Sequence, residues 1–307
     1  MEHLENSFKG KNNLWRYIVM IAAIFAATNT IGAIPVLIAV LIKSVSNYGV
    51  LPQISSGSDY MSILGIGQNM GFVLMLFPFI AGLAAYALLV MPLHGRTFMQ
   101  TITGARKFRW KHFCISGAVW MVLMGISLFV FMLINPGDFT VNNTGPSLIV
   151  LIILSFALIP FQAAFEEVIF RGYLMQGFTA VLPARLFALL STAALFAAMH
   201  SFNPEVKEYG FLTIMPQYFT FGLIFGIATI FDNGIESALG AHAANNIFLC
   251  IMLTSKSSAL QTPALFEQHT YNAGSELAAM VISGIIFLGI LWKIFGWKTG
   301  VKPRAFS

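Results

Sequence analysis

Eight long apolar segments make up most of this 307-residue chain. Each approaches the roughly 20 residues that an α-helix needs to cross about 30 Å of hydrocarbon. A helix also satisfies its own backbone polar groups, which hydrocarbon requires. The segments cover residues 17–42, 69–93, 115–135, 147–178, 183–201, 211–231, 236–254 and 276–296. The pattern therefore predicts an all-α, polytopic membrane protein with about eight transmembrane helices in one bundle.

Charged residues are too scarce to cover a surface in water. They form 9% of the chain and hydrophobic residues form 57%, whereas an ordinary soluble domain carries about 25% charged residues. The net charge of +5 then bears on orientation and lipid contacts, and nucleic acid is not expected as a partner. Cys114 and Cys250 match no metal or redox spacing, so we interpret both as small packing residues.

The distribution of Lys and Arg predicts which side of the membrane each connector faces. If the N-terminus is cytoplasmic, thirteen of these residues fall on the cytoplasmic side and three fall opposite. The three are Lys43, Lys207 and Lys256. This bias predicts a multi-pass protein of the cell membrane with both termini in the cytoplasm. We expect a tail over residues 1–16, one transmembrane domain over 17–296, and a second tail over 297–307.

Two features outside the polar cluster have mainly structural interpretations. The basic stretch 106–111 is interleaved with aromatic residues and is expected to anchor at the interface by binding anionic lipid. Gly222 and Gly226 form a GxxxG pattern, for which close packing inside the bundle is favoured over a dimer interface. We interpret the charged connector that holds Glu205, Lys207 and Glu208 as a solvated loop. The alternative is that it gates the mouth of a site.

Three charged residues lie inside the fourth segment, where each costs at least about 2.5–3.5 kcal/mol on insertion scales. Glu167 and Arg171 are i and i+4, so they share a helix face and can pair. Glu166 is turned about 100° away, and its i+4 neighbour is Phe170. A carboxyl without a partner in low dielectric holds its proton more readily than in water, and one that titrates near pH 7 suits general-base work.

Further polar residues occur in later apolar segments. His200 ends the fifth segment, and His242 and Asn246 share a face near the start of the seventh. At 1.5 Å per residue, Glu166 and His200 lie at the same depth from the turn that joins their helices. His242 falls roughly 13 Å short of that depth on the same estimate. A buried ion-pair cluster that only fixes helix packing is the alternative to a functional site.

The three motifs together resemble those of one protease family. Glu166 to Arg171 reads EExxxR, Phe196 to His200 reads FxxxH, and His242 to Asn246 reads HxxxN. In this order they resemble the CAAX prenyl endopeptidase type II and bacteriocin-processing (CPBP, or ABI) family of intramembrane proteases. The resemblance covers about residues 145–255. It implies hydrolysis of membrane-anchored or hydrophobic peptides, among them prenylated CAAX-type substrates.

The resemblance also implies a role for each motif residue. Glu166 would activate water, His200 would hold that water, and His242 with Asn246 would stabilise the oxyanion as two neutral donors. Glu167, Arg171 and Phe196 would support them. The favoured mechanism needs no cofactor. The alternative is a zinc peptidase with Glu166, His200 and His242 as ligands, although HExxH is absent.

The sequence leaves two other classes of function as alternatives. One is a catalytically silent family member that acts as a scaffold or bacteriocin-immunity protein. The other is a proton-coupled membrane carrier that uses intramembrane Glu, His and Arg as a relay. A carrier favours inverted repeats and broken helices in matching halves, and the sequence has no evident repeat.

Overall fold

A computed structural model describes residues 2–46, 65–255 and 257–297. The N-terminal elements are α1 (Glu2–Glu5), η1 (Asn6–Lys9), α2 (Leu14–Asn29), α3 (Ile34–Ser46), α6 (Gln68–His94), α7 (Phe98–Ile102) and α8 (Trp110–Ile134). The central elements are η2 (Pro136–Asp138), β1 (Phe139–Val141), α9 (Pro146–Glu167), η3 (Val168–Leu174), α10 (Met175–Val181) and α11 (Arg185–Met199). The last elements are α12 (Pro204–Tyr209), α13 (Phe211–Asp232), α14 (Glu236–Met252), β2 (Leu253–Thr254), β3 (Phe266–Gln268) and α15 (Ala273–Phe295).

The fold is an all-α membrane bundle, as the sequence predicts, but the count of eight spans is not confirmed. Among the described residues, six helical stretches are long and apolar enough to cross a membrane. They are Leu14–Val45, Gln68–His94, Trp110–Ile134, Pro146–Val181, Phe211–Asp232 and Ala273–Phe295. The other two expected spans form α11, with 15 residues, and α14, with 17. Both are shorter than the roughly 20 residues of a usual membrane-spanning helix.

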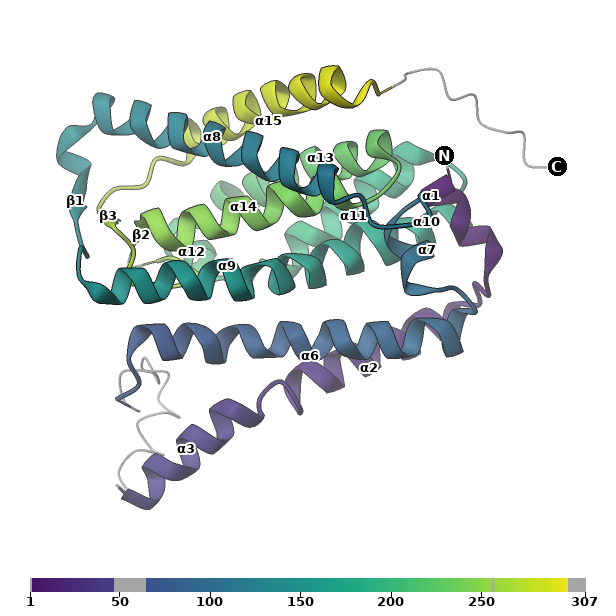
Figure 1. Cartoon of the computed structure of the whole chain (residues 1–307), viewed down its shortest axis with the longest axis horizontal. Helices are drawn as coiled ribbons and strands as arrows, with labels where there is room; N and C mark the ends of the chain where they lie inside the picture. The colour runs from purple at the N-terminus through teal and green to yellow at the C-terminus, as the bar shows by residue number, and fades with distance from the viewer. Residues whose placement is uncertain (1, 47–64, 256, 298–307) are drawn as a thin grey trace.

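Helix α14 lies inside the bundle rather than at its edge (Figure 1). It packs between α8 and α9 and also contacts α13, and most of its residues are buried. Helices α11 and α13 pack against each other, while α2 and α6 form a further layer against α9. The outer helices expose many large apolar side chains, as lipid-facing surfaces do.

The ends of the helices are set by local signals. Gly95 follows α6 at φ 67°, Asn233 follows α13 at φ 58°, and Gly296 follows α15 at φ 61°. These left-handed conformations close a helix and are taken readily by Gly and Asn. At the other end of the bundle, β3 pairs antiparallel with β1 and parallel with β2. This small sheet joins the connectors before α9 and α15.

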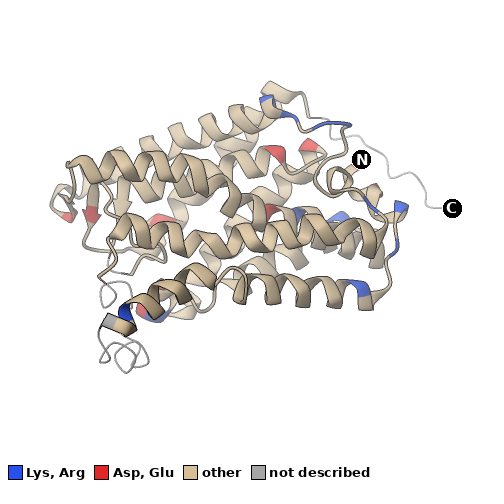
Figure 2. Cartoon of the chain, turned by 60° about the horizontal axis from the view of Figure 1, so that its bottom comes forward, with Lys and Arg blue, Asp and Glu red and all other residues tan. Residues whose placement is uncertain are grey.

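The two ends of the bundle differ in charge. Figure 2 shows most Lys and Arg at the end that carries the N-terminus. The first residues belong to this end and are not extended: His3, Leu4, Asn6 and Ser7 are buried. Residues 52–59, between the first two predicted spans, lie outside the described residues, as do the basic residues Lys256, Lys298, Lys302 and Arg304.

The GxxxG pattern serves packing within the bundle, as expected. A Cβ on Gly222 would lie 2.9 Å from Ala193 Cα, and one on Gly226 would lie 2.4 Å from Leu189 Cδ1. Both contacts are with α11. The absence of side chains at these glycines therefore lets α13 approach α11 closely.

Candidate active site

The acidic pair lies where α9 changes to a π-helical segment. Glu166 and Glu167 are the last residues of α9, and the π-helical η3 follows directly. The Met175 N–H bonds to the Phe170 carbonyl, five residues earlier. Such wider turns inside α-helices occur frequently at functional sites. The EExxxR motif therefore spans a local departure from regular α-helix.

Glu167 and Arg171 form a buried ion pair, which confirms the predicted pairing. Arg171 Nη1 donates to Glu167 Oε1 at 2.7 Å, and both residues are fully buried. The guanidinium lies 4.4 Å from the ring centroid of Phe196, a cation–π distance. Phe196 thus contacts the charged core of the site from α11.

His242 connects the two glutamates. Its Nδ1 lies 2.7 Å from Glu167 Oε1, and its Nε2 lies 3.5 Å from Glu166 Oε2. Glu167 Oε1 also accepts from Arg171 Nη1, so one carboxylate oxygen contacts both the guanidinium and the imidazole. His242 as a neutral donor stays a prediction.

His200 approaches Glu166 from the end of α11. It occupies the C-cap position of that helix, and its Nδ1 donates to the Phe196 carbonyl at 2.7 Å. Its Nε2 lies 4.0 Å from Glu166 Oε2. This separation exceeds a direct hydrogen bond and is typical of a contact that one water bridges.

The expected depth mismatch of His242 is absent from the structure. Ile235, in the turn before α14, donates its N–H to the Ile102 carbonyl. A Cβ on Gly172 would lie 2.7 Å from the neighbouring Thr101 carbonyl. The α13–α14 turn is therefore level with Gly172, six residues beyond Glu166, and α10 continues past it. The estimate failed because it placed both turns at the same depth.

A series of hydrogen-bonded side chains, of which only Asn246 belongs to the motifs, leads to Glu166. Trp120 Nε1 donates to Asn245 Oδ1, and Asn245 Nδ2 donates to Asn246 Oδ1. Asn246 Nδ2 then donates to Gln162 Oε1 at 2.8 Å, and Gln162 Nε2 donates to Glu166 Oε1. Each donor points along the chain toward the carboxylate.

The hydrogen bond from Gln162 corrects the interpretation of Glu166 as a carboxyl without a partner. Phe170 lies at i+4 from Glu166, whereas the partner Gln162 lies at i−4 on the same helix face. That i−4 spacing was the sequence signal for the partner of Glu166. The sequence held no signal for the contact of Trp120 with Asn245, because α8 and α14 are far apart in the sequence.

The exposure of the site residues indicates the side from which it is reached. Glu166 is 7% exposed and His242 is 2% exposed, while Glu167 and Arg171 are fully buried. His200 and Asn246 are half-buried. The least buried side of the cluster is therefore the side where His200 and Asn246 lie.

The zinc alternative is tested by the donor arrangement. Within residues 2–46, 65–255 and 257–297, no group of three His, Cys, Asp or Glu is arranged to hold a metal ion. Glu166, His200 and His242 are nevertheless donor types that zinc accepts. Zinc held by these three residues stays an alternative, which cleavage in the presence of a chelator tests.

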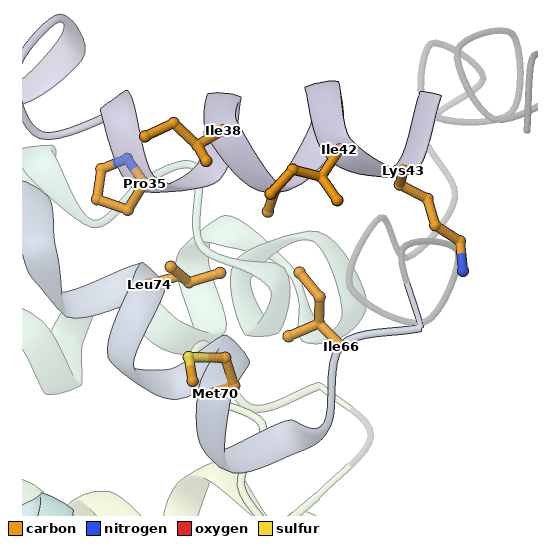
Figure 3. A pocket seen from close by; sticks show the side chains of 8 residues that line it. Pro35, Ile38, Ile42, Lys43, Ile66, Met70 and Leu74 are labelled. Atoms are coloured by element: carbon orange, nitrogen blue, oxygen red, sulfur yellow. The ribbon is translucent and has the colours of Figure 1, made fainter. Parts of the chain in front are cut away.

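A separate apolar cleft of about 320 Å³ lies between α3 and α6. Figure 3 shows Ile38 and Ile42 of α3 facing Leu74 and Met70 of α6, with Lys43 at one end. It shares no lining residue with the polar cluster. We therefore assign the chemistry to the cluster and not to this cleft.

The fold and the site define a multi-pass membrane protein of the membrane-protease class. A family model described as type II CAAX prenyl endopeptidase Rce1-like matches residues 145–248, which include every motif residue. The chain is also 30% identical over 296 residues to "Uncharacterized protein YyaK" of Bacillus subtilis (strain 168), covering 94% of this chain and 96% of that protein. No solved structure matches significantly. The chain belongs to the Rce1-like family of type II CAAX prenyl endopeptidases.

Proposed function

We propose that this protein is an intramembrane endopeptidase in which Glu166 activates water, with membrane-anchored or hydrophobic peptides as substrates. Prenylated CAAX-type peptides are the substrate class that the family suggests. One observation carries the proposal: Glu166 Oε2 lies 3.5 Å from His242 Nε2 and 4.0 Å from His200 Nε2. Glu166 ends α9, His242 lies in α14 and His200 caps α11. Two imidazole nitrogens therefore flank one carboxylate oxygen.

The first step is water addition. A water molecule held between Glu166 Oε2 and His200 Nε2 loses a proton to Glu166 as its oxygen attacks the scissile carbonyl carbon. Gln162 donates to the other carboxylate oxygen, which leaves Oε2 for the water. His200 Nδ1 is held by the Phe196 carbonyl, so Nε2 is the ring atom that faces the water.

The second step is collapse of the tetrahedral intermediate. One N–H of the Asn246 amide donates to Gln162, and the other is directed to the oxyanion. His242, whose ring Glu167 holds at Nδ1, supplies the second donor. The carbon–nitrogen bond then breaks, and Glu166 returns its proton to the leaving nitrogen.

Peptide cleavage by the purified protein in lipid tests this function. The panel holds prenylated and plain hydrophobic peptides, with wild type, Glu166→Gln, and Glu267→Gln as a control carboxyl in β3. We expect cleavage by wild type and Glu267→Gln, and a loss of at least about 10³-fold in Glu166→Gln. Cleavage should persist with a strong chelator.

Other outcomes favour the other classes of protein. Loss of cleavage with the chelator and recovery with zinc would support a metallopeptidase. Equal behaviour of wild type and Glu166→Gln would contradict the proposal and favour a scaffold, an immunity protein or a proton-coupled carrier. Proton-coupled uptake in proteoliposomes then separates the carrier from the other two.

We further propose that the basic end of the bundle faces the cytoplasm and contacts anionic lipid. Within the basic stretch, Arg109 pairs with Asp232 and Glu236, whereas Arg106, Lys107 and Lys111 are exposed. Labelling of Lys107→Cys and Asp138→Cys by a membrane-impermeant reagent, in a Cys114→Ala background, tests orientation. Only Asp138→Cys should react in intact cells. Reaction of Lys107→Cys alone would reverse the orientation.

A further inference from the structure

We propose that Tyr218 is a positioning residue for His200, and that Asn203 and Glu205 fix Tyr218 in place. This proposal deepens the proposed function and concerns the same site. It adds residues of α12 and α13, and of the turn before α12, to the motif residues.

The contact between the two rings is direct. The rings of His200 and Tyr218 are stacked, with centroids 4.3 Å apart and planes 24° apart. The Phe196 ring centroid lies 4.5 Å from that of His200. Two aromatic rings therefore limit the tilt of the imidazole, and such pairs have a specific geometry beyond simple burial.

His200 needs this support because its backbone holds it weakly. It lies just past α11, where regular helix ends, and its side chain is 18% exposed. Nδ1 bonds to the Phe196 carbonyl, while Nε2 lies 4.0 Å from Glu166. One hydrogen bond fixes one ring atom but leaves the ring plane free to turn about it. Stacking on Tyr218 removes that freedom and aims Nε2 at Glu166.

The chain that follows His200 holds the hydroxyl of Tyr218. Asn203 donates its backbone N–H to the His200 carbonyl at 3.1 Å and its side-chain Nδ2 to Tyr218 Oη at 2.7 Å. The Tyr218 hydroxyl donates to Glu205 Oε1. The turn after His200 thus folds back and secures the ring that stacks on His200.

Helix α12 is itself anchored. Val206 is buried against Ile214 and Met215 of α13. Tyr209 stacks on Tyr271, with centroids 4.4 Å apart. Glu205 is half-buried, whereas Lys207 and Glu208 are exposed. Of the charged connector after His200, Glu205 therefore belongs to the support of the site, and the other two charges face outward.

The test compares Tyr218→Leu with Tyr218→Phe. Phenylalanine keeps the stacked ring and loses the hydroxyl, while leucine loses both. Tyr17→Leu is the matched control, because it removes the stack of Tyr17 on Tyr173, which does not touch His200 or α12. Steady-state cleavage is measured together with the ¹⁵N spectrum of the histidine side chains, in which the His200 signals are assigned by their loss in His200→Gln.

We expect kcat to fall about two- to tenfold in Tyr218→Leu with KM nearly unchanged. Tyr218→Phe should recover most of that loss. The wild-type His200 should show a protonated Nδ1 and an unprotonated Nε2, and this pattern should give way to mixed tautomers in Tyr218→Leu alone. An unchanged kcat and His200 spectrum in folded Tyr218→Leu would overturn the proposal. So would equal damage in Tyr218→Phe and Tyr218→Leu.

The spectrum separates this proposal from the proposed function. If wild type cleaves no peptide, the peptidase fails, but the loss of the fixed tautomer in Tyr218→Leu still supports positioning by Tyr218. If cleavage depends on Glu166 and the His200 spectrum is the same in all Tyr218 variants, the peptidase stands and the positioning role fails.

Discussion

His242 Nδ1 lies 2.7 Å from Glu167 Oε1, the same oxygen that accepts from Arg171 Nη1 at 2.7 Å. One buried oxygen therefore joins the ion pair of the EExxxR motif to the first residue of the HxxxN motif. The carboxylate therefore fixes the orientation of the His242 ring through Nδ1. The supporting glutamate thus acts on the chemistry through the histidine.

The change Glu167→Gln tests this link. An amide in place of the carboxylate binds Arg171 and His242 Nδ1 more weakly, so the His242 ring is no longer held with Nε2 facing Glu166. We expect kcat to fall by about 10²-fold or more, with a smaller change in KM. Single-turnover cleavage on the folded variant is the measurement. A Glu167→Gln variant with wild-type kcat would contradict the role of Glu167 in orienting His242.

Removal of the positive partner should destabilise the protein through the charge left behind. Arg171→Met leaves Glu167 buried without its cation, which costs about 3–5 kcal/mol of unfolding free energy. The double change Glu167→Gln and Arg171→Met removes both charges and should recover part of this loss. Unfolding in mixed detergent measures both. If the double variant is as unstable as the sum of the two single variants, the charges do not interact as described.

Gln162 should matter although it lies outside the three motifs. Gln162→Leu breaks the amide chain between Asn246 and Glu166, so the oxyanion donor and the base are no longer held relative to each other. We expect kcat to fall about tenfold or more. The matched control is Gln217→Leu, whose amide bonds to Tyr271 and Ala273 on other elements. Equal activity of both variants would show that the chain is not needed.

Stability should depend on pH through His3 at the basic end. Its ring Nε2 donates to the Arg171 carbonyl at 3.1 Å, and burial lowers the pKa of His3 from 6.5 to about 4. Below pH 6.5 His3 takes up a proton in the unfolded chain, whereas in the folded chain it stays neutral until the pH falls to about 4. Stability is therefore complete above pH 6.5 and is lost as the pH falls toward 4, by about 3 kcal/mol.

The measurement for this prediction is the unfolding midpoint in detergent between pH 7 and pH 4. His3→Gln keeps a donor for the Arg171 carbonyl but cannot take up the proton. Its stability should therefore fall less steeply across this range than that of wild type. Parallel pH profiles for the two proteins would show that His3 does not contribute to acid sensitivity.

The sequence by itself determined the features that depend on local periodicity. Apolar length fixed the helical membrane class, and the four-residue spacing fixed the pairing of Glu167 with Arg171, because both depend only on the geometry of one helix. Gly222 and Gly226 likewise predicted close packing inside the bundle, although only the structure identifies α11 as the partner. Of the motif residues, Glu166, His200 and His242 lie together.

Only the tertiary structure decided how the helices are offset. The level of His242 depends on how far α10 extends past the α13–α14 turn, and no residue within α14 encodes that distance. The contacts of Trp120 with Asn245, of His3 with Arg171 and of Tyr218 with His200 join residues far apart or on different elements, so no periodic pattern reveals them. Short helices such as α14 need not span the bilayer, because neighbouring helices bury them. Packing between helices sets these relationships, and it is fixed by the whole bundle at once.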